Sequence, residues 1–236
     1  MFSYNWTIVL IIPGIILSLW AQWKVKHAYA KYAEIGTQAG ITGAQVAARI
    51  LQEAGIGLVG NTKGATGQVV GLEAIPGQMT DHYDPRDRTL RLSQDVYNGH
   101  SIAAIGIAAH EVGHAIQHAK AYSMLLWRTA IYPATRFAST LAWPLLLAGF
   151  IFSFKPLISI GIAFFAFAVL FTLITLPVEF DASRRAIRAL SNGGYLTDDE
   201  LYGAKKVLSA AAWTYVAAAA VAILELVRLL IMSRSR

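Results

Sequence analysis

Four long apolar segments divide this chain of 236 residues. They lie at 1–23, 137–154, 156–178 and 207–224. Each lacks charged side chains over a length close to the roughly 20 helical residues that cross a bilayer. The fourth extends to residue 232 if Glu225 and Arg228, which are three residues apart, neutralise each other. The pattern therefore predicts four transmembrane helices.

Short polar breaks and flanking charges define how these segments connect. Lys155-Pro156 separates the second and third segments, so 137–178 is predicted to form a transmembrane hairpin. The first segment could be a signal peptide, but no Lys or Arg precedes it and the nearest Ala-x-Ala triplet, 28–30, lies beyond Lys24 and Lys26. We therefore expect an uncleaved anchor.

With four spans, 24–136 and 179–206 share one side of the membrane. Basic residues near span ends favour the cytoplasmic side. This side holds Lys24, Lys26, Lys31, Arg128, Arg136, Arg184, Arg185, Arg188, Lys205 and Lys206, whereas the other side holds Lys155, Arg234 and Arg236. The prediction is a multi-pass protein of the cell (inner) membrane with its polar parts in the cytoplasm and both termini outside. Its parts are the anchor 1–23, the cytoplasmic domain 24–136, the hairpin 137–178, the cytoplasmic segment 179–206 and the C-terminal transmembrane helix 207–236.

Turn and capping signals organise the polar parts. Capping boxes at 42–45 and 197–200 predict the starts of two helices, the first of them ending near residue 54. Two short strands, 79–83 and 89–93, flank the turn sequence DPRD and predict a small β-hairpin. Ser101 can cap a long helix over 102–119.

Composition agrees with a membrane protein. Hydrophobic residues make up 56% and charged residues 14%, against about 45–50% and about 25% in soluble domains. The net charge of +6 is explained by topology and anionic lipid, and no nucleic-acid-binding motif is present, so no nucleic acid is expected as a partner. The chain has no cysteine, which excludes disulfides and thiolate metal ligands.

The helix predicted over 102–119 contains the metal-binding signature HExxH. His110 and His114 are four residues apart and share one helix face, so both imidazoles could bind one zinc ion. Glu111 lies beside them, where it could take a proton from a water molecule. Two satisfied helix histidines and a surface glutamate are the alternative. A helix without proline and with small neighbours favours the metal site.

A catalytic zinc ion needs a third protein ligand and an open position. His118 is unsuitable because it lies about 12 Å along the helix from His110, so we expect it to pack beside the site. Glu179, where the third span leaves the membrane, is the strongest candidate, and Asp181 on another helix face is weaker. Glu179 could also be an acid at a span end that reaches toward water.

Two motifs together resemble a known family. HEVGHAIQH at 110–118 and PVEFDASRRA at 177–186 are similar to the YugP-like bacterial membrane zinc metallopeptidases, and more distantly to the HtpX-like enzymes. The similarity covers most of the chain. It implies His110, His114 and Glu179 as zinc ligands and Glu111 as the catalytic base. Gluzincins carry an aspartate four residues after the glutamate ligand that orients a ligand histidine, whereas this chain has Ser183; that support must be weaker or come from Asp181 or elsewhere.

The expected fold is a mainly α membrane protein with four transmembrane helices and a zincin-like metallopeptidase domain containing a small β-hairpin. The expected function is zinc-dependent hydrolysis of peptide bonds in membrane or membrane-proximal proteins. Zinc would lower the pKa of a water molecule to about 7, and Glu111 would pass its proton to the leaving amine. The His₂Glu ligand set and abundance favour zinc over manganese or cobalt.

The sequence offers candidates, but no single choice, for the group that stabilises the oxyanion and for the strand that aligns the substrate. The oxyanion could be stabilised by a basic side chain, the candidates being His82, Arg184, Arg185 and Arg188. The strand 89–93 could align an extended peptide by strand pairing. The partners expected are a protein or peptide substrate and the lipid bilayer, and the sequence predicts no oligomeric state.

Two other functions compete with this one. An intramembrane site-2-type protease would place 102–109 in the bilayer, although the flanking charges at 91, 95, 120 and 128 favour a core helix. A non-catalytic membrane scaffold would keep the motif for a structural zinc ion.

Overall fold

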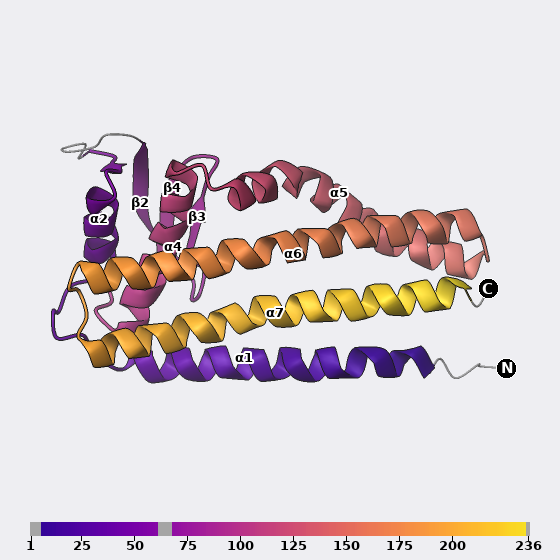
Figure 1. Cartoon of the computed structure of the whole chain (residues 1–236), viewed down its shortest axis with the longest axis horizontal. Helices are drawn as coiled ribbons and strands as arrows, with labels where there is room; N and C mark the ends of the chain where they lie inside the picture. The colour runs from indigo at the N-terminus through magenta and orange to yellow at the C-terminus, as the bar shows by residue number, and fades with distance from the viewer. Residues whose placement is uncertain (1–5, 61–67, 235–236) are drawn as a thin grey trace. The chain divides into compact units, whose positions relative to one another are not determined.

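The computed structural model describes residues 6–60 and 68–234 (Figure 1). It is 74% helical, and its contacts define two compact units. The first unit contains Met1–Trp23, Leu126–Pro177 and Trp213–Arg236, and the second contains Lys24–Leu125 and Val178–Ala212. The first five residues of the predicted anchor, and Arg236, lie outside the described part. The five-part division of the chain made from the sequence stays a prediction.

Four helices of the described residues are long and apolar enough to cross a membrane, as judged by length and composition. A 3₁₀ turn, η1 (Trp6–Ile11), leads into α1 (Ile12–Ala33), and the others are α5 (Ser123–Ile151), α6 (Lys155–Asn192) and α7 (Asp198–Arg234). The expected mainly α membrane fold is thereby confirmed.

The helices are longer than the apolar segments. α5 begins at Ser123 rather than near 137, and α6 continues without interruption through Pro177 to Asn192. The chain reverses at 152–154, so Lys155 and Pro156 begin α6 instead of forming the break. Proline suits a first helical turn. Charged residues end an apolar segment but not a helix, since Arg, Lys and Glu are good helix formers.

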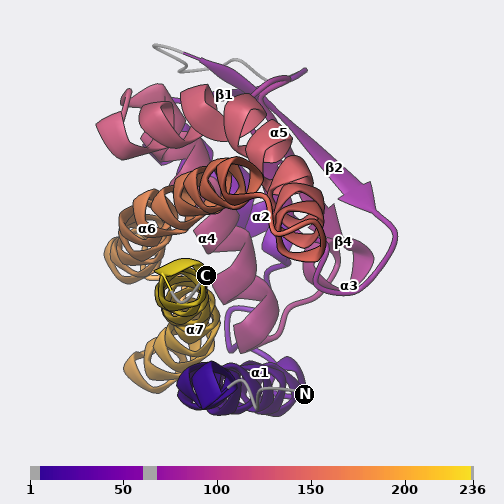
Figure 2. The same ribbon diagram turned by 90° about the vertical axis from the view of Figure 1, so that its right-hand side faces the viewer.

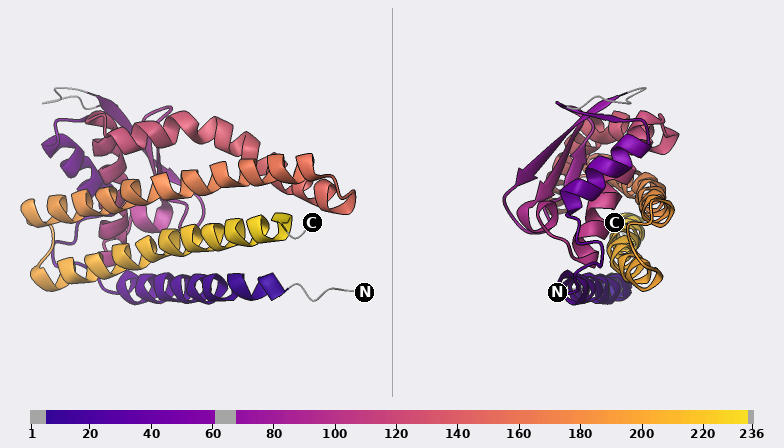
Figure 3. Two further views of the ribbon diagram at one scale, coloured as in Figure 1. Left: turned by 45° about the vertical axis from the view of Figure 1, so that its right-hand side comes forward. Right: turned by 90° about the vertical axis from the view of Figure 1, so that its left-hand side faces the viewer.

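Packing in the first unit involves all four helices. Leu146 of α5, Ile158 of α6 and Leu229 of α7 form a buried cluster. Figures 1 and 3 show α1 and α7 side by side, and the Trp20 and Trp213 rings meet edge to face with centroids 5.3 Å apart. Many large apolar side chains stay exposed on these helices, as a lipid-facing surface requires.

The charged pair in α7 behaves as the sequence predicts. The Arg228 guanidinium donates to both carboxylate oxygens of Glu225, at 2.7 and 3.1 Å. Both side chains are largely buried, with relative exposures of 19% for Arg228 and 10% for Glu225. Mutual pairing is therefore confirmed.

The second unit is built around a mixed sheet. Its strands in the described residues are β1 (Gly57–Leu58), β2 (Val69–Ile75), β3 (His82–Asp84) and β4 (Thr89–Ser93), in the order β1-β2-β4-β3. β3 and β4 form the predicted antiparallel hairpin, although β3 begins at His82 and not at residue 79. β2 pairs with β4 in parallel. The hairpin is thus one side of a larger sheet, which can be followed in Figures 2 and 3.

Helices α2 (Gly43–Glu53), α3 (Gln94–Tyr97) and α4 (Ile102–Ala119) complete this unit. The predicted capping boxes at 42–45 and 197–200 are both confirmed, because backbone and side chain exchange hydrogen bonds at each. The Ser101 hydroxyl accepts the Ala104 N–H at the start of α4. The shared core includes fully buried residues of helices and strands, among them Ile50, Leu51, Leu90, Leu92, Ile105 and Val112.

A close helix contact fixes α4 against the second part of α6. Gly113 lies against the backbone of Ala182, and a Cβ atom at Gly113 would stand 2.5 Å from the Ala182 carbonyl oxygen. Gly106, two turns earlier on α4, has more room, since a Cβ atom there would stand 3.4 Å from the nearest neighbour, Ala204 Cβ. Of these two glycines, Gly113 is the one that must stay without a side chain.

This difference predicts opposite effects for one substitution at two sites of α4. Gly113→Ala should push α6 away and lower the stability by about 1–3 kcal/mol, the usual penalty of overpacking. Gly106→Ala should be neutral or raise stability by up to about 1 kcal/mol, because alanine favours the helix. Thermal melting of both variants in the same detergent measures the difference. Equal melting temperatures would show that the helices are not in close contact at Gly113.

Candidate metal centre

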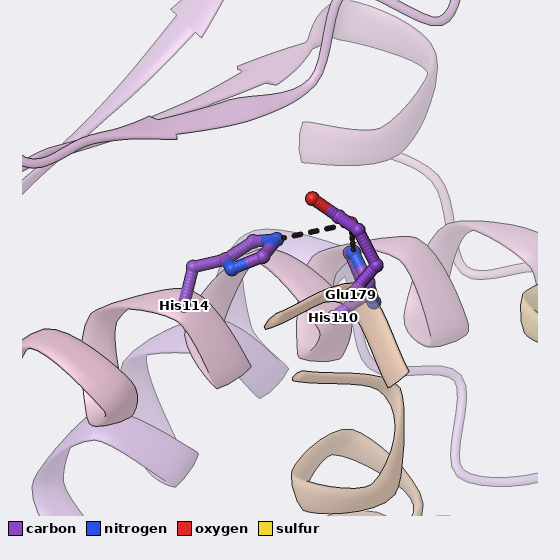
Figure 4. Close-up of side chains that lie close together, drawn as sticks. All are labelled: His110, His114 and Glu179. Atoms are coloured by element: carbon purple, nitrogen blue, oxygen red, sulfur yellow. Dashed lines mark ion pairs between the residues drawn. The ribbon is translucent and has the colours of Figure 1, made fainter. Parts of the chain in front are cut away.

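α4 and α6 bring two histidines and one carboxylate together inside the second unit. His110 Nε2 and His114 Nε2 lie 3.4 and 3.5 Å from the same oxygen, Glu179 Oε2. Figure 4 shows the three side chains pointing toward one another. The planes of the two imidazoles are 86° apart. Their possible ligand atoms all lie within 4.8 Å of one another. Glu179 and His114 are buried, at 3% and 8% exposure.

This arrangement fits a zinc ion. Zinc–nitrogen and zinc–oxygen bonds are about 2.0–2.2 Å long, and in a tetrahedral site two ligand atoms therefore lie about 3.3–3.5 Å apart. Two imidazole nitrogens and a carboxylate oxygen are ligands that zinc accepts, and three protein ligands leave one tetrahedral position for a reactant. His110, His114 and Glu179 could thus hold the metal, although metal binding by them stays a prediction.

The other nitrogen of each imidazole contacts a side chain of the same unit. His110 Nδ1 lies 3.1 Å from the Ser183 hydroxyl, at the position where gluzincins carry an aspartate. His114 Nδ1 lies 3.0 Å from Gln117 Oε1, and the Gln117 amide also contacts Asp181. Asp181 therefore reaches a histidine only through Gln117. Such outer contacts orient the ring and leave Nε2 available for a metal.

Glu111 is buried beside this group and bonded to a strand. Its Oε2 accepts the backbone N–H of Tyr83 at 2.9 Å. Tyr83 lies on β3, which is one of the two terminal strands of the sheet among the described residues. β3 therefore fixes the direction of the Glu111 carboxylate. The sequence did not indicate this role of Tyr83, because the contact joins residues 28 positions apart.

His118 is not part of the ligand group and contacts Tyr83 instead. The Tyr83 hydroxyl and His118 Nδ1 are 2.8 Å apart. Burial raises the pKa of Tyr83 to about 12, and burial lowers the pKa of His118 below its ordinary value, with nearby Arg88 adding to the effect. Both groups therefore stay neutral, and the Tyr83 hydroxyl donates a hydrogen bond to His118 Nδ1.

Candidates for the oxyanion are placed elsewhere or already paired. The Arg185 Nε and Arg184 Nη2 atoms lie 2.5 and 3.6 Å from the Asp181 carboxylate. His82 pairs across the sheet with Arg91 and is exposed, whereas the neighbouring Tyr83 is buried. Arg188 is exposed on α6. The structure thus brings none of these four into the ligand group of the described residues.

The proposed peptide-aligning strand also needs correction. Thr89–Ser93 is β4, and it has β2 on one side and β3 on the other. An internal strand has no open edge for a peptide, so the prediction for 89–93 is wrong. Among the described strands the terminal one next to Glu111 is β3.

Two histidines on an HExxH helix beside a buried glutamate of α6, in a chain with four membrane-length helices, define a membrane protein of the HExxH metalloprotein class. The profile of a family described as "Putative neutral zinc metallopeptidase" matches residues 7–234. The chain is also 47% identical over 221 residues to a protein named "Putative membrane protease YugP" from Bacillus subtilis (strain 168), covering 94% of this chain and 93% of the relative. The chain therefore belongs to this zinc metallopeptidase family. No solved structure matches it.

The lowered pKa of His118 predicts a pH dependence of stability. The folded protein favours the neutral ring, so the unfolded chain takes up a proton more readily as the pH falls below about 6.5. Stability from this group is present above that pH and is lost on acidification. The melting temperature of the wild type should therefore fall more between pH 7.5 and 5.5 than that of His118→Gln. Identical slopes for the two proteins would contradict the burial of a neutral His118.

Proposed function

We propose that this protein is a zinc-dependent endopeptidase at the cytoplasmic face of the membrane, with His110, His114 and Glu179 as metal ligands and Glu111 as general base. The convergence of two imidazole Nε2 atoms on one buried Glu179 oxygen, at distances of 3.4 and 3.5 Å, carries the proposal. Membership in the zinc metallopeptidase family supports it independently.

Zinc, when bound, would supply a Lewis acid that polarises the scissile carbonyl and acidifies a water molecule. Glu111 would take the proton of that water and deliver it to the leaving amine. Its bond from the Tyr83 N–H holds one carboxylate oxygen in place, so the group does not need to reorient before it reacts.

The edge of β3 is our candidate for substrate alignment. Residues of an antiparallel strand direct their N–H and C=O groups alternately toward and away from the partner strand. The Tyr83 N–H points to Glu111 and so away from β4, and its carbonyl shares that direction. Because Glu111 already accepts this N–H, only the Tyr83 carbonyl could bond to a peptide N–H at this edge. An extended peptide that paired there would pass next to Glu111.

The position of the candidate site along the chain limits which substrates can reach it. Glu179 follows Pro177, the residue at which the first unit ends on α6, by two positions. The helices of the first unit have lipid-compatible surfaces, and most of the basic residues near the span ends lie in 24–136 and 179–206. We therefore place the site in the cytoplasm close to the membrane. Membrane-anchored or membrane-proximal proteins are then the substrates within reach.

The competing functions have less support. α4 is not among the candidate spans of the described residues, and its residues 102, 105 and 112 lie in the core of the second unit. That is unfavourable for an intramembrane protease. A scaffold with structural zinc would share the ligands, so only the role of Glu111 distinguishes it from an enzyme.

The two carboxylates should separate binding from catalysis. Glu111→Gln should keep one zinc ion per chain and lose cleavage of casein by about a thousandfold or more, because the general base is removed. Glu179→Ala should lose much of the zinc as well as cleavage, because a metal ligand is removed. Metal content of the purified full chain and proteolysis are the measurements.

Glu73→Gln is the matched control, since Glu73 is an exposed carboxylate on β2 paired with Arg91. It should behave as the wild type in both assays. Cleavage by Glu111→Gln at the wild-type rate would disprove the mechanism. Normal zinc content in Glu179→Ala would remove Glu179 from the ligand set.

The orientation has its own test, because the chain has no cysteine. Ser153→Cys in the α5–α6 turn and Ser191→Cys near the end of α6 each introduce one exposed thiol. A membrane-impermeant maleimide should label position 153 in intact cells and position 191 only after the membrane is opened. The opposite pattern would put the metal centre outside the cell.

A further inference from the structure

Gln117 is a fully buried amide whose hydrogen-bonding atoms all have partners. It lies on α4 three residues after His114 and is 0% exposed. Its Oε1 is 3.0 Å from His114 Nδ1, and its Nε2 is 2.8 Å from the Val178 carbonyl oxygen and 2.9 Å from Asp181 Oδ2. A buried amide in an apolar helix is unfavourable unless it is bonded in this way.

The partners of Nε2 determine which way the amide points. A carbonyl oxygen and a carboxylate oxygen can only accept hydrogen bonds, so the NH₂ group must face Val178 and Asp181. The amide oxygen then faces His114 Nδ1. Because that oxygen can only accept, Nδ1 must carry the proton, and the lone pair of a neutral ring lies on Nε2. Nε2 is the atom that faces Glu179.

We infer that Gln117 is a positioning residue that fixes the His114 tautomer and carries the influence of Asp181 to that ligand. This inference rests on the proposed metal site. In many zinc sites a carboxylate contacts the ligand histidine directly, whereas here an amide stands between His114 and Asp181.

Asp181 is itself held in place from its far side. Arg185 Nε lies 2.5 Å from Asp181 Oδ2, and the Arg185 guanidinium lies over the Tyr122 ring at 5.7 Å from its centroid. The ordered carboxylate polarises the Gln117 amide and makes its oxygen a stronger acceptor. The series Arg185–Asp181–Gln117–His114 therefore orients the imidazole from outside the metal site.

The same amide also links the two ligand-bearing helices. Val178, whose carbonyl it binds, immediately precedes Glu179 on α6. One side chain thus holds His114 and the backbone next to the third ligand. His110 differs, because its partner Ser183 has a hydroxyl that can donate or accept and so selects no tautomer. Of the two histidines, His114 is therefore the one whose tautomer is fixed by its partner.

Gln117→Met tests this inference, because methionine keeps the length and removes both polar groups. Zinc affinity of the metal-free full chain in detergent, measured by competition with a chelator, should weaken about 10–100-fold. Ile116→Met is the matched control at the neighbouring buried position and should stay within about twofold of the wild type. Melting of the metal-free proteins shows whether each variant folds.

A second readout distinguishes positioning from simple packing. In metal-free wild type labelled with ¹⁵N-histidine, the ring shifts should show the His114 proton on Nδ1, with the signal assigned by its loss in His114→Gln. The proton should redistribute toward Nε2 in Gln117→Met. Wild-type zinc affinity in a folded Gln117→Met, or a wild-type His114 without a proton on Nδ1, would overturn the inference.

Failure of the proposed function would look different. A wild type that binds no zinc would refute the metal site, while the tautomer measured without metal would still decide the role of Gln117. If Gln117→Met did not fold, the wild-type tautomer alone would decide it.

Discussion

The close approach of α4 and α6 is the constraint on which the candidate metal centre depends. Gly113 lets α4 approach the backbone of α6 closely at Ala182. Glu179 and Ser183 then come within reach of the HExxH histidines, although about 70 residues of chain, including an entire hairpin, separate the two motifs. Without this contact, His110 and His114 would still share one helix, but Glu179 would lie away from them.

The sequence predicted the locally encoded parts of the fold. Helix starts at 42 and 197 depend on residues three positions apart, and spans depend on runs of apolar residues, so each can be recognised within a short window. The parallel pairing of β2 with β4 could not be recognised this way, because β3 and a turn lie between these two strands in the sequence. The ends of the apolar segments did not predict the ends of the helices. α5 begins before, and α6 ends after, the charged residues that mark the membrane boundary.

The residues of the candidate site likewise fall into those that a local pattern predicts and those that it does not. His110, Glu111 and His114 follow from helical periodicity, and Glu179 required the resemblance to a family as well as its place at a span end. Gln117 offered a weak signal, an amide three residues after His114 on a mostly apolar helix. Tyr83 offered none, since its contact with Glu111 is made by the backbone. Contacts of main-chain atoms carry no side-chain signature.

Helix α6 is one continuous element from Lys155, at the far end of the predicted membrane hairpin, to Asn192, and Glu179 is part of it. Tilt responds to bilayer thickness through hydrophobic mismatch. Pro177 removes one backbone hydrogen bond just before Glu179 and makes bending easiest there. Glu179 therefore follows the most easily bent point of α6 by two residues.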